Sequence, residues 1–400
     1  MGLFVLLGAT FLTILALIPG GNALELFRGF IDGNQSEYRQ ATSPTVSNPT
    51  SNTGVARANN LRLLNDDSFY HAGYLELPVA GATGWAATAT SLVRSGTDEV
   101  IAVLSAGTAF RILEEEDAWW YIERATGSGG ETGWVQHTYC MINLPDVVPS
   151  IIYDNTNAYS SAFISSGENI PGITGARLYS FSDRSDGRSF NARLQRYEYI
   201  VPVLYSTAKR VSQAQRNALE NGDTLIMYEA FRPASVQTQV ADALSAFANA
   251  NSDIRTGIST PPWSIGWFIS TGISNHQRGY AVDIGLARVI AVEEAEIGGY
   301  RYRRITQFEI YEMPSPIHEL SIRSITTVGP ASSELSESIK NNPYALALRH
   351  YAMDAGLTPL PSEWWHFDDL HTAQNITEMG GNGNFRGNFE IRYILSVPPG

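Results

Sequence analysis

Residues 274–283 read SNHQRGYAVD and place an imidazole and a carboxylate seven positions apart. Gly279 permits a turn between them. Residues 280–284 then form a largely apolar run around Asp283, which is typical of a buried strand. We therefore expect a loop carrying His276 to lead into a strand carrying Asp283, with both side chains facing one cleft.

A second stretch, residues 363–366, reads EWWH and adds another carboxylate and another imidazole. Glu363 and His366 are three positions apart, which places them on one face if the segment is helical. Neutral imidazole and carboxylate oxygen are ligands that Zn²⁺ accepts, and three protein ligands leave one position open for catalysis. The sequence therefore predicts His276, Asp283 and His366 as ligands of one zinc ion, with Glu363 as the general base.

These two spacings also occur in purely structural settings, so neither establishes a metal site by itself. A third stretch adds support, because residues 229–237 read EAFRPASVQ. In this order the three motifs resemble those of the zinc D-Ala-D-Ala peptidases, the family that includes vancomycin-resistance-type dipeptidases and carboxypeptidases. That family shares its metal site with lysostaphin-type endopeptidases and hedgehog domains. The resemblance covers roughly residues 143–395.

Strands and helices alternate in this part of the chain, which indicates an α+β domain with a central antiparallel sheet flanked by helices. The resemblance implies the same architecture, the LAS/hedgehog-like fold. The apolar patterns predict strands at 147–153 and 225–228 and helices at 197–219, 236–250 and 344–357.

The resemblance also implies roles for further residues. Arg232 would hold the oxyanion that develops during amide hydrolysis, and Gln237, from the same motif, would contact the substrate. Ser274 lies where the family binds the terminal carboxylate of the substrate, and Trp365 would shape the pocket wall. The alternative for Arg232 is a structural ion pair with Glu229.

His318 marks a departure from the family pattern. Residues 313–318 read MPSPIH and resemble a family segment that often reads Met-x-Thr-x-Phe-Asp. In the strict dipeptidases of the family, that aspartate anchors the free amine of D-Ala-D-Ala. Here Ile317 and His318 stand in its place, so His318 is the expected substrate contact and a strict dipeptidase role is disfavoured.

Residues 69–142 contain short alternating segments separated by polar turns, which predict a small all-β unit. The segments LVRSG at 92–96, GTAFRIL at 107–113 and GWV at 133–135 resemble the strands of bacterial SH3-like (SH3b) domains. The resemblance implies an SH3-like barrel that binds the cell wall, although a passive spacer is the alternative. Trp119, Trp120 and Trp134 could line a ligand groove, and the alternative is that two of the three fill the core of the barrel.

Residues 1–23 contain an apolar run at 3–18 followed by small residues, which is typical of a secretory signal peptide or of a membrane anchor. Residues 24–68 are mainly polar and predict a flexible linker. We therefore expect export to the extracellular space, the cell wall or the outer face of the membrane. The single cysteine, Cys140, excludes an internal disulfide and is expected to be a buried, inert thiol.

The net charge of −13 argues against a nucleic-acid partner, which would require a basic face. The features together predict an exported zinc D,D-carboxypeptidase, with one Zn²⁺ per chain, whose peptidase domain spans 143–400 and whose substrates are peptidoglycan stem peptides. A D-Ala-D-Ala dipeptidase and a peptidoglycan endopeptidase are the enzyme alternatives. An alternative from another class is a wall-binding protein whose peptidase fold is inactive.

Overall fold

The computed structural model describes residues 75–126, 129–154, 162–163, 169–171, 186–250, 252–378 and 395–399. The predicted signal peptide or anchor at 1–23 and the predicted linker at 24–68 lie outside these residues. Within the described part of the chain, no helix combines the length and the apolar character that crossing a membrane requires. The fold is mixed α+β, with antiparallel sheets and several helices, as the sequence predicted.

The N-terminal part of the described chain is built on an eight-stranded sheet with the order β13-β7-β1-β4-β5-β6-β2-β3. Its strands are β1 (Thr83–Ala86), β2 (Thr90–Val93), β3 (Val100–Leu104), β4 (Ala109–Glu116), β5 (Trp119–Thr126), β6 (Gly129–Gln136), β7 (Cys140–Asn143) and β13 (Pro202–Leu204). Alternate side chains of these strands point inward, so that Leu92, Phe110, Ile112, Trp120 and Ile122 are all fully buried.

A second sheet has the order β17-β18-β15-β14-β8, and β16 also pairs with β15. Its strands are β8 (Ile152–Tyr153), β14 (Asp223–Glu229), β15 (Ala281–Ile297), β16 (Tyr300–Ile310), β17 (Thr358–Pro359) and β18 (His366–Asp368). All of its pairings are antiparallel except the parallel pair β14 and β8. Two small hairpins complete the strands: β9 (Ala162–Phe163) with β10 (Asn169–Pro171), and β11 (Ser189–Asn191) with β12 (Arg196–Glu198).

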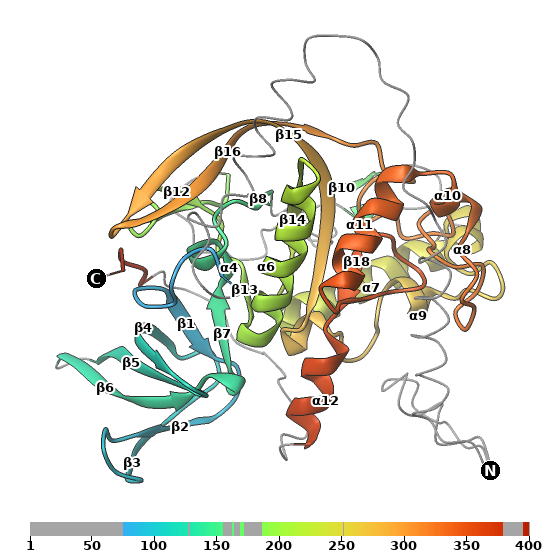
Figure 1. Ribbon diagram of the computed structural model, residues 1–400. Coiled ribbons are helices and arrows are strands. Elements are labelled where there is room, and N and C mark those ends of the chain that lie inside the picture. The colour runs from blue at the N-terminus through green and yellow to red at the C-terminus, as the bar shows by residue number, and fades with distance from the viewer. Residues whose placement is uncertain are drawn as a thin grey trace, which may run out of the picture.

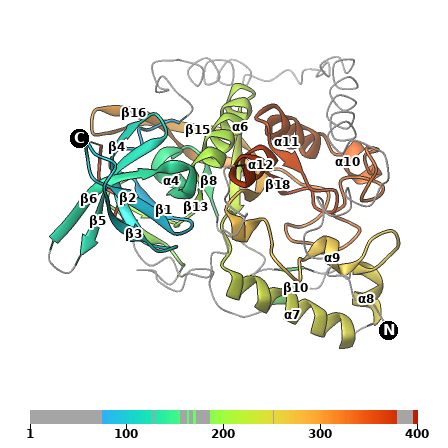
Figure 2. The same cartoon turned by 90° about the horizontal axis from the view of Figure 1, so that it is seen from below.

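Most of the helices gather around the second sheet (Figure 1). They are α4 (Leu144–Val147), α6 (Tyr205–Glu220), α7 (Ala234–Ala250), α8 (Ser252–Ile258), α9 (Ile265–Phe268), α10 (Glu337–Lys340), α11 (Pro343–Asp354) and α12 (Leu370–Glu378), with the 3-10 helices η2 (His137–Tyr139) and η3 (His276–Arg278). Helix α6 packs against both β14 and α11, and its apolar stripe of Ala208, Val211, Ala214 and Ala218 is fully buried. Figure 2 shows α7 and α8 side by side, on the opposite side of the molecule from β4 and β5.

Several predicted elements are confirmed: β14 contains the predicted strand 225–228, α7 begins two residues before 236, and α11 covers most of 344–357. The predicted helix 197–219 was wrong over its first part, because β12 ends at Glu198 and β13 occupies 202–204 before α6 begins. The predicted strand 147–153 is reduced to β8. Helix α4 ends at Val147, where the predicted strand was to begin. Pro149, which cannot donate to a strand ladder, lies between α4 and β8.

The chain passes from the first sheet to the second in two places: after β7, through α4, and after β13, through α6. Strand β7 pairs with β1 on one side and with β13 on the other, so the eight-stranded sheet continues across the predicted boundary between 142 and 143. Directly after β13, Tyr205 of α6 packs against Trp120, with ring centroids 4.7 Å apart. Trp120 therefore fills the core, whereas Trp119 and Trp134 are only partly buried.

This junction also reaches the loop that carries His276. The amide of Leu204 donates to the carbonyl of Gly279 over 2.9 Å. A Cβ at Gly279, where φ is +78°, would lie 3.1 Å from Leu204 Cγ and 3.3 Å from Met141 Sδ. The N-terminal sheet thus packs directly against the end of the histidine loop, and Gly279 meets both a steric and a conformational requirement.

Candidate metal centre

Strand register brings the predicted ligands together. Strand β15 lies between β14 and β18, and Asp283 on β15 is the direct partner of His366 on β18 and of Glu229 on β14. His276 opens the helical turn η3, which Gly279 ends in a left-handed conformation. This short turn places the side chain of His276 close to Asp283 on β15. His276, Asp283 and His366 are all nearly fully buried.

The three ligand atoms have the spacing of a metal site. Nε2 of His276 lies 3.1 Å from Nδ1 of His366. Oδ1 of Asp283 lies 3.0 Å from His366 Nδ1 and 3.3 Å from His276 Nε2. Ligands bound tetrahedrally at about 2.0–2.1 Å are separated from one another by about 3.3 Å. The three atoms therefore match three corners of a metal-binding tetrahedron.

The other nitrogen of each imidazole already has an acceptor. Nδ1 of His276 lies 2.6 Å from the carbonyl of Ala230, and Nε2 of His366 lies 3.1 Å from Oδ1 of Asp368. A neutral ring that donates through these nitrogens keeps its lone pair on the nitrogen that faces Asp283. Two lone pairs and one carboxylate oxygen then converge. A cation between them would satisfy all three acceptors, so these residues could hold a metal ion.

The charges around the ligands favour a cation as well. Burial alone would raise the pKa of Asp283, but the surrounding imidazoles of His276, His318 and His366 hold that pKa well below its ordinary value. Burial alone would lower the pKa of His366, but the carboxylates of Asp368 and Asp283 raise it well above its ordinary value. A metal ion must therefore displace a proton from His366 when it binds.

Glu363 lies beside the three candidate ligands but is not one of them. It precedes β18 in a turn in which the amide of His366 approaches the Glu363 carbonyl at 3.4 Å. Its Oε2 is 3.8 Å from Nδ1 of His366, and the side chain is buried. Burial raises the pKa of Glu363 to about 8, against the opposing effect of His366. A carboxylate with a raised pKa is a stronger base than an exposed glutamate.

Arg232 is held by its neighbours. It donates from Nε and Nη2 to the two carboxylate oxygens of Glu229, over 2.6 and 2.7 Å, and from Nη1 to Gln237 Oε1 over 2.7 Å. Burial disfavours the guanidinium charge, but Glu229 outweighs it and raises the pKa of Arg232. Nη2 also lies 3.8 Å from Oδ2 of Asp283. Three of the five N–H donors serve these bonds, and a fourth belongs to Nη2 beside Asp283, which leaves the second N–H of Nη1 for a ligand.

A second buried group, Glu229, Asp283 and His318, also brings three ligand atoms within 4.8 Å of one another. The guanidinium of Arg232 already neutralises Glu229 there. A metal ion in this group would face that positive charge at short range. The group of His276, Asp283 and His366 is therefore the better metal site.

The remaining predicted residues surround this centre. Ser274 Oγ accepts from the amide of His276 over 3.3 Å, and the Ser274 amide donates to Gln277 Oε1 over 2.6 Å. Gln237 donates to the carbonyl of Ser270 over 2.6 Å, so its side chain ties Arg232 to the loop before His276. The buried ring of Trp365 meets His318 edge to face, with centroids 5.6 Å apart.

Sequence reasoning named no partner for His366, and the structure supplies Asp368. The two residues are alternate positions of β18, so their side chains share one face of the strand. This spacing was visible in the sequence. The carbonyl of Ala230 gave no such signal, because a backbone acceptor is identified only by the fold around it.

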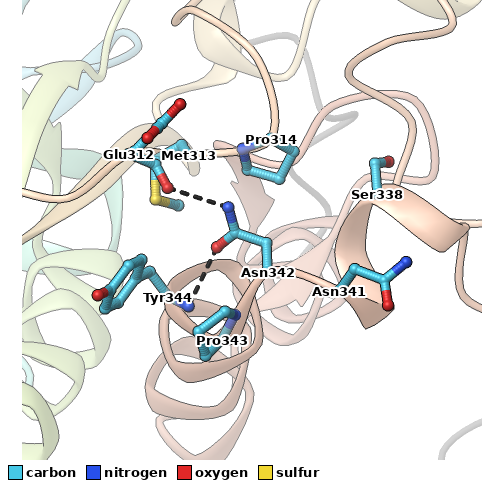
Figure 3. Close-up of a pocket in the computed structure, with 8 residues that line it drawn as sticks. All are labelled: Glu312, Met313, Pro314, Ser338, Asn341, Asn342, Pro343 and Tyr344. Carbon is cyan, nitrogen blue, oxygen red and sulfur yellow. Dashed lines mark hydrogen bonds between the residues drawn. The ribbon is translucent and has the colours of Figure 1, made fainter.

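A surface pocket of about 380 Å³ lies apart from the metal centre (Figure 3). Its lining residues are Glu312, Met313, Pro314, Ser338, Asn341, Asn342, Pro343 and Tyr344. Asn342 accepts from the amide of Tyr344 over 3.1 Å and donates to the carbonyl of Glu312 over 3.0 Å. Its polar atoms thus cap α11, and the pocket contributes nothing to the metal chemistry.

A scan against protein-family models gives no match to the chain, and a search of curated proteins gives none either.

Proposed function

We propose that this protein is a zinc D,D-carboxypeptidase that hydrolyses the terminal D-Ala-D-Ala bond of peptidoglycan stem peptides. The observation that carries the proposal is the convergence of two imidazole nitrogens and one carboxylate oxygen at 3.0–3.3 Å beside the buried Glu363. The motif resemblance to the zinc D-Ala-D-Ala peptidases supplies the reaction class, and with it the LAS/hedgehog-like fold.

Zinc fits this donor set best. Two imidazoles and a carboxylate, in tetrahedral spacing, suit Zn²⁺ better than Mg²⁺ or Ca²⁺, which favour six or more oxygen ligands. The second nitrogen of each histidine is hydrogen-bonded, as metal-bound histidines usually are. One such site per chain implies one Zn²⁺.

Zinc, when bound, would polarise the scissile carbonyl and lower the pKa of a water molecule to about 7. The Glu363 carboxylate takes a proton from the attacking water as the new C–O bond forms. It then delivers that proton to the amide nitrogen as the C–N bond breaks, which releases D-alanine as a neutral amine. Burial raises the pKa of Glu363, and a bound cation would offset part of that rise, so the carboxylate would be ionised and able to accept the proton.

Arg232 is positioned to stabilise negative charge next to this reaction. Glu229 and Gln237 fix its guanidinium, so little reorganisation is needed when an oxyanion develops. Its ion pair with Glu229 and its proposed catalytic role are compatible, because the second N–H of Nη1 remains for a ligand when Nη2 serves Glu229 and faces Asp283.

The dipeptidase alternative is weakened by His318. A free amine needs a carboxylate partner, whereas His318 provides an imidazole 3.5 Å from Asp283 Oδ2. An endopeptidase would use the same centre on a cross-bridge. The inactive alternative conflicts with an arrangement in which the ligands, the base and Arg232 all lie together.

For the N-terminal sheet we propose an SH3-like wall-binding role in an exported protein. Trp119 and Tyr121 are alternate positions of β5, and Trp134 on β6 is the direct partner of Tyr121. The rings of Tyr121 and Trp134 lie 5.2 Å apart. These partly buried aromatic side chains form a strip on the face opposite Trp120, where a wall polymer could stack.

Mass spectrometry of reaction products tests the reaction. The zinc-loaded protein should release a single D-alanine from a stem pentapeptide and leave free D-Ala-D-Ala intact. Glu363→Gln, which keeps the ligands and removes the base, is the matched control and should release none. Cleavage of cross-linked muropeptides alone would replace the proposal with an endopeptidase. No cleavage of any of the three substrates would overturn it.

A further inference from the structure

His318 is a buried histidine in a constrained backbone. Its backbone φ is +59°, in the left-handed region that most residues avoid. The side chain is 1% exposed, yet neither ring nitrogen makes a hydrogen bond of good geometry within the described part of the chain. A buried polar ring without partners costs stability, so its presence here calls for a role.

A carboxylate oxygen of Asp283, one of the proposed metal ligands, lies close to this ring. Nε2 of His318 lies 3.5 Å from Oδ2 of Asp283, and Nη2 of Arg232 lies 3.8 Å from the same oxygen. The other oxygen, Oδ1, faces the nitrogens of His276 and His366. The two oxygens of Asp283 are thus divided between two environments.

We propose that His318 is a positioning residue that, together with Arg232, holds Oδ2 of Asp283 so that Asp283 binds the metal through Oδ1 alone. A carboxylate that binds through one oxygen fills one corner of a tetrahedron, whereas binding through both oxygens adds a ligand and distorts it. The proposal rests on the metal centre of the proposed function and is independent of the peptide substrate.

The surroundings hold His318 in place for this role. Its loop is fastened to the segment that carries Glu363: Trp364 Nε1 donates to Ser315 Oγ over 3.0 Å, and Ser324 Oγ donates to the Ser362 carbonyl over 3.1 Å. The ring stands edge to face with Trp365 and Tyr228, at 5.6 and 6.5 Å. Both anchors and both walls restrict movement away from Asp283.

A matched pair of substitutions tests the role. Gln places an N–H donor about where His318 has Nε2, whereas Leu has a similar size and no donor, and both share the same backbone cost. Zinc affinity, measured by competition with a chelator, should fall about tenfold or more in His318→Leu and stay within about threefold of the wild type in His318→Gln. The absorption spectrum of the cobalt-loaded protein should change in His318→Leu and be retained in His318→Gln.

Two outcomes would overturn the proposal. One is unchanged affinity and an unchanged cobalt spectrum in both variants. The other is a His318→Gln variant that loses affinity as much as His318→Leu. If His318→Leu does not fold, His318→Gln decides alone, because a loss of about tenfold there contradicts the role. These readouts do not use peptide cleavage, so a metal-binding protein without peptidase activity would refute the proposed function and leave this inference standing.

Discussion

Asp283 and His366 are direct partners across the antiparallel pair β15 and β18, and their side-chain ligand atoms lie 3.0 Å apart. On the opposite side of β15, Asp283 is the partner of Glu229, which holds Arg232. A single strand position therefore connects the metal ligands to the arginine. Register therefore places Asp283 and His366, whereas the loop that ends at Gly279 places His276.

Variants of the proposed ligands and of the proposed base should differ in the amount of zinc that they bind. His276→Ala removes one of three ligands and should reduce zinc from about one per chain to nearly none. Glu363→Ala should keep the zinc and abolish turnover, because we propose Glu363 as the base and not as a ligand. Elemental analysis of the purified variants measures both. Zinc retained in His276→Ala would contradict the ligand assignment.

Metal retention should depend on acidity through His366. The raised pKa of His366 means that its proton is held to higher pH than on a free imidazole, so protons compete with the metal as pH falls. Asp368→Asn removes the charge that raises this pKa. The same charge attracts a divalent cation more strongly than it attracts a proton, so its loss weakens metal binding more than it weakens proton binding. The pH at which half the zinc is lost on dialysis should therefore shift upward in Asp368→Asn.

Asp354→Asn provides the control for this titration, since Asp354 pairs with the half-exposed His350 on α11, away from the centre. The control should lose zinc at the same pH as the wild type. An Asp368→Asn variant with an unchanged midpoint would show that Asp368 does not help His366 to hold the metal.

Arg232 should contribute to both stability and turnover. Arg232→Ala leaves Glu229 buried without its partner, which typically costs about 3–5 kcal/mol. Combining it with Glu229→Gln removes the stranded charge and should recover part of that loss. The double variant should still show kcat reduced at least about a hundredfold. A normal kcat in the double variant would assign Arg232 to the ion pair alone.

Stability should also vary with pH through Glu76, which lies at the junction of the two sheets. Its carboxylate accepts from both the amide and the hydroxyl of Ser150. Burial raises the pKa of Glu76 from 4.5 to about 7. The folded state therefore binds this proton more tightly than the unfolded chain does. As pH rises from about 4.5 to about 7, the free energy of unfolding should fall by on the order of 3 kcal/mol because of Glu76.

Glu76→Gln should remove this part of the pH dependence. Urea denaturation at pH 5 and pH 8 measures the difference, and the fall in unfolding free energy between the two should be smaller in Glu76→Gln than in the wild type. Glu99→Gln, at an exposed glutamate, should leave the fall unchanged. Equal falls in all three proteins would contradict the assignment.

The sequence predicted the parts of the fold that local pattern controls. The apolar run of β14 and the periodicity of α7 were sufficient for both elements. The long hairpin of β15 and β16 was not predicted, although Gly298 and Gly299 have positive φ values of 53° and 79° and give a two-residue turn. Gly-Gly between two alternating segments was a readable signal.

Contacts between segments that are distant in the sequence could not be predicted from local sequence patterns. The motifs named His276, Asp283 and His366, but the pairing of β15 with β18 determines how Asp283 and His366 lie, and the turn η3 determines where His276 lies. Similarly, the strand β13 was read as helix because its three residues gain their conformation from β7, sixty positions earlier in the chain. Such pairing is a tertiary effect that overrides short-range propensity.

The three tryptophans of the N-terminal sheet should behave differently. Trp120 is fully buried against Tyr205, so Trp120→Ala should destabilise the protein by about 3–5 kcal/mol. Trp119 and Trp134 lie on the other face of the sheet, so Trp119→Ala and Trp134→Ala should leave the fold and the zinc content unchanged. Each should weaken co-sedimentation with purified wall sacculi, because an aromatic stacking surface is lost.

Single substitutions are the appropriate test here, because removing the N-terminal sheet would take away β7 and Met141, which packs beside Gly279 at the end of the histidine loop. Release of D-alanine from a soluble pentapeptide should be normal in Trp119→Ala and Trp134→Ala, whereas release from sacculi should fall. An immobile polymer rewards a second binding surface and a soluble peptide does not. Equal sedimentation of all three proteins, wild type included, would make the sheet a support for the histidine loop rather than a wall-binding unit.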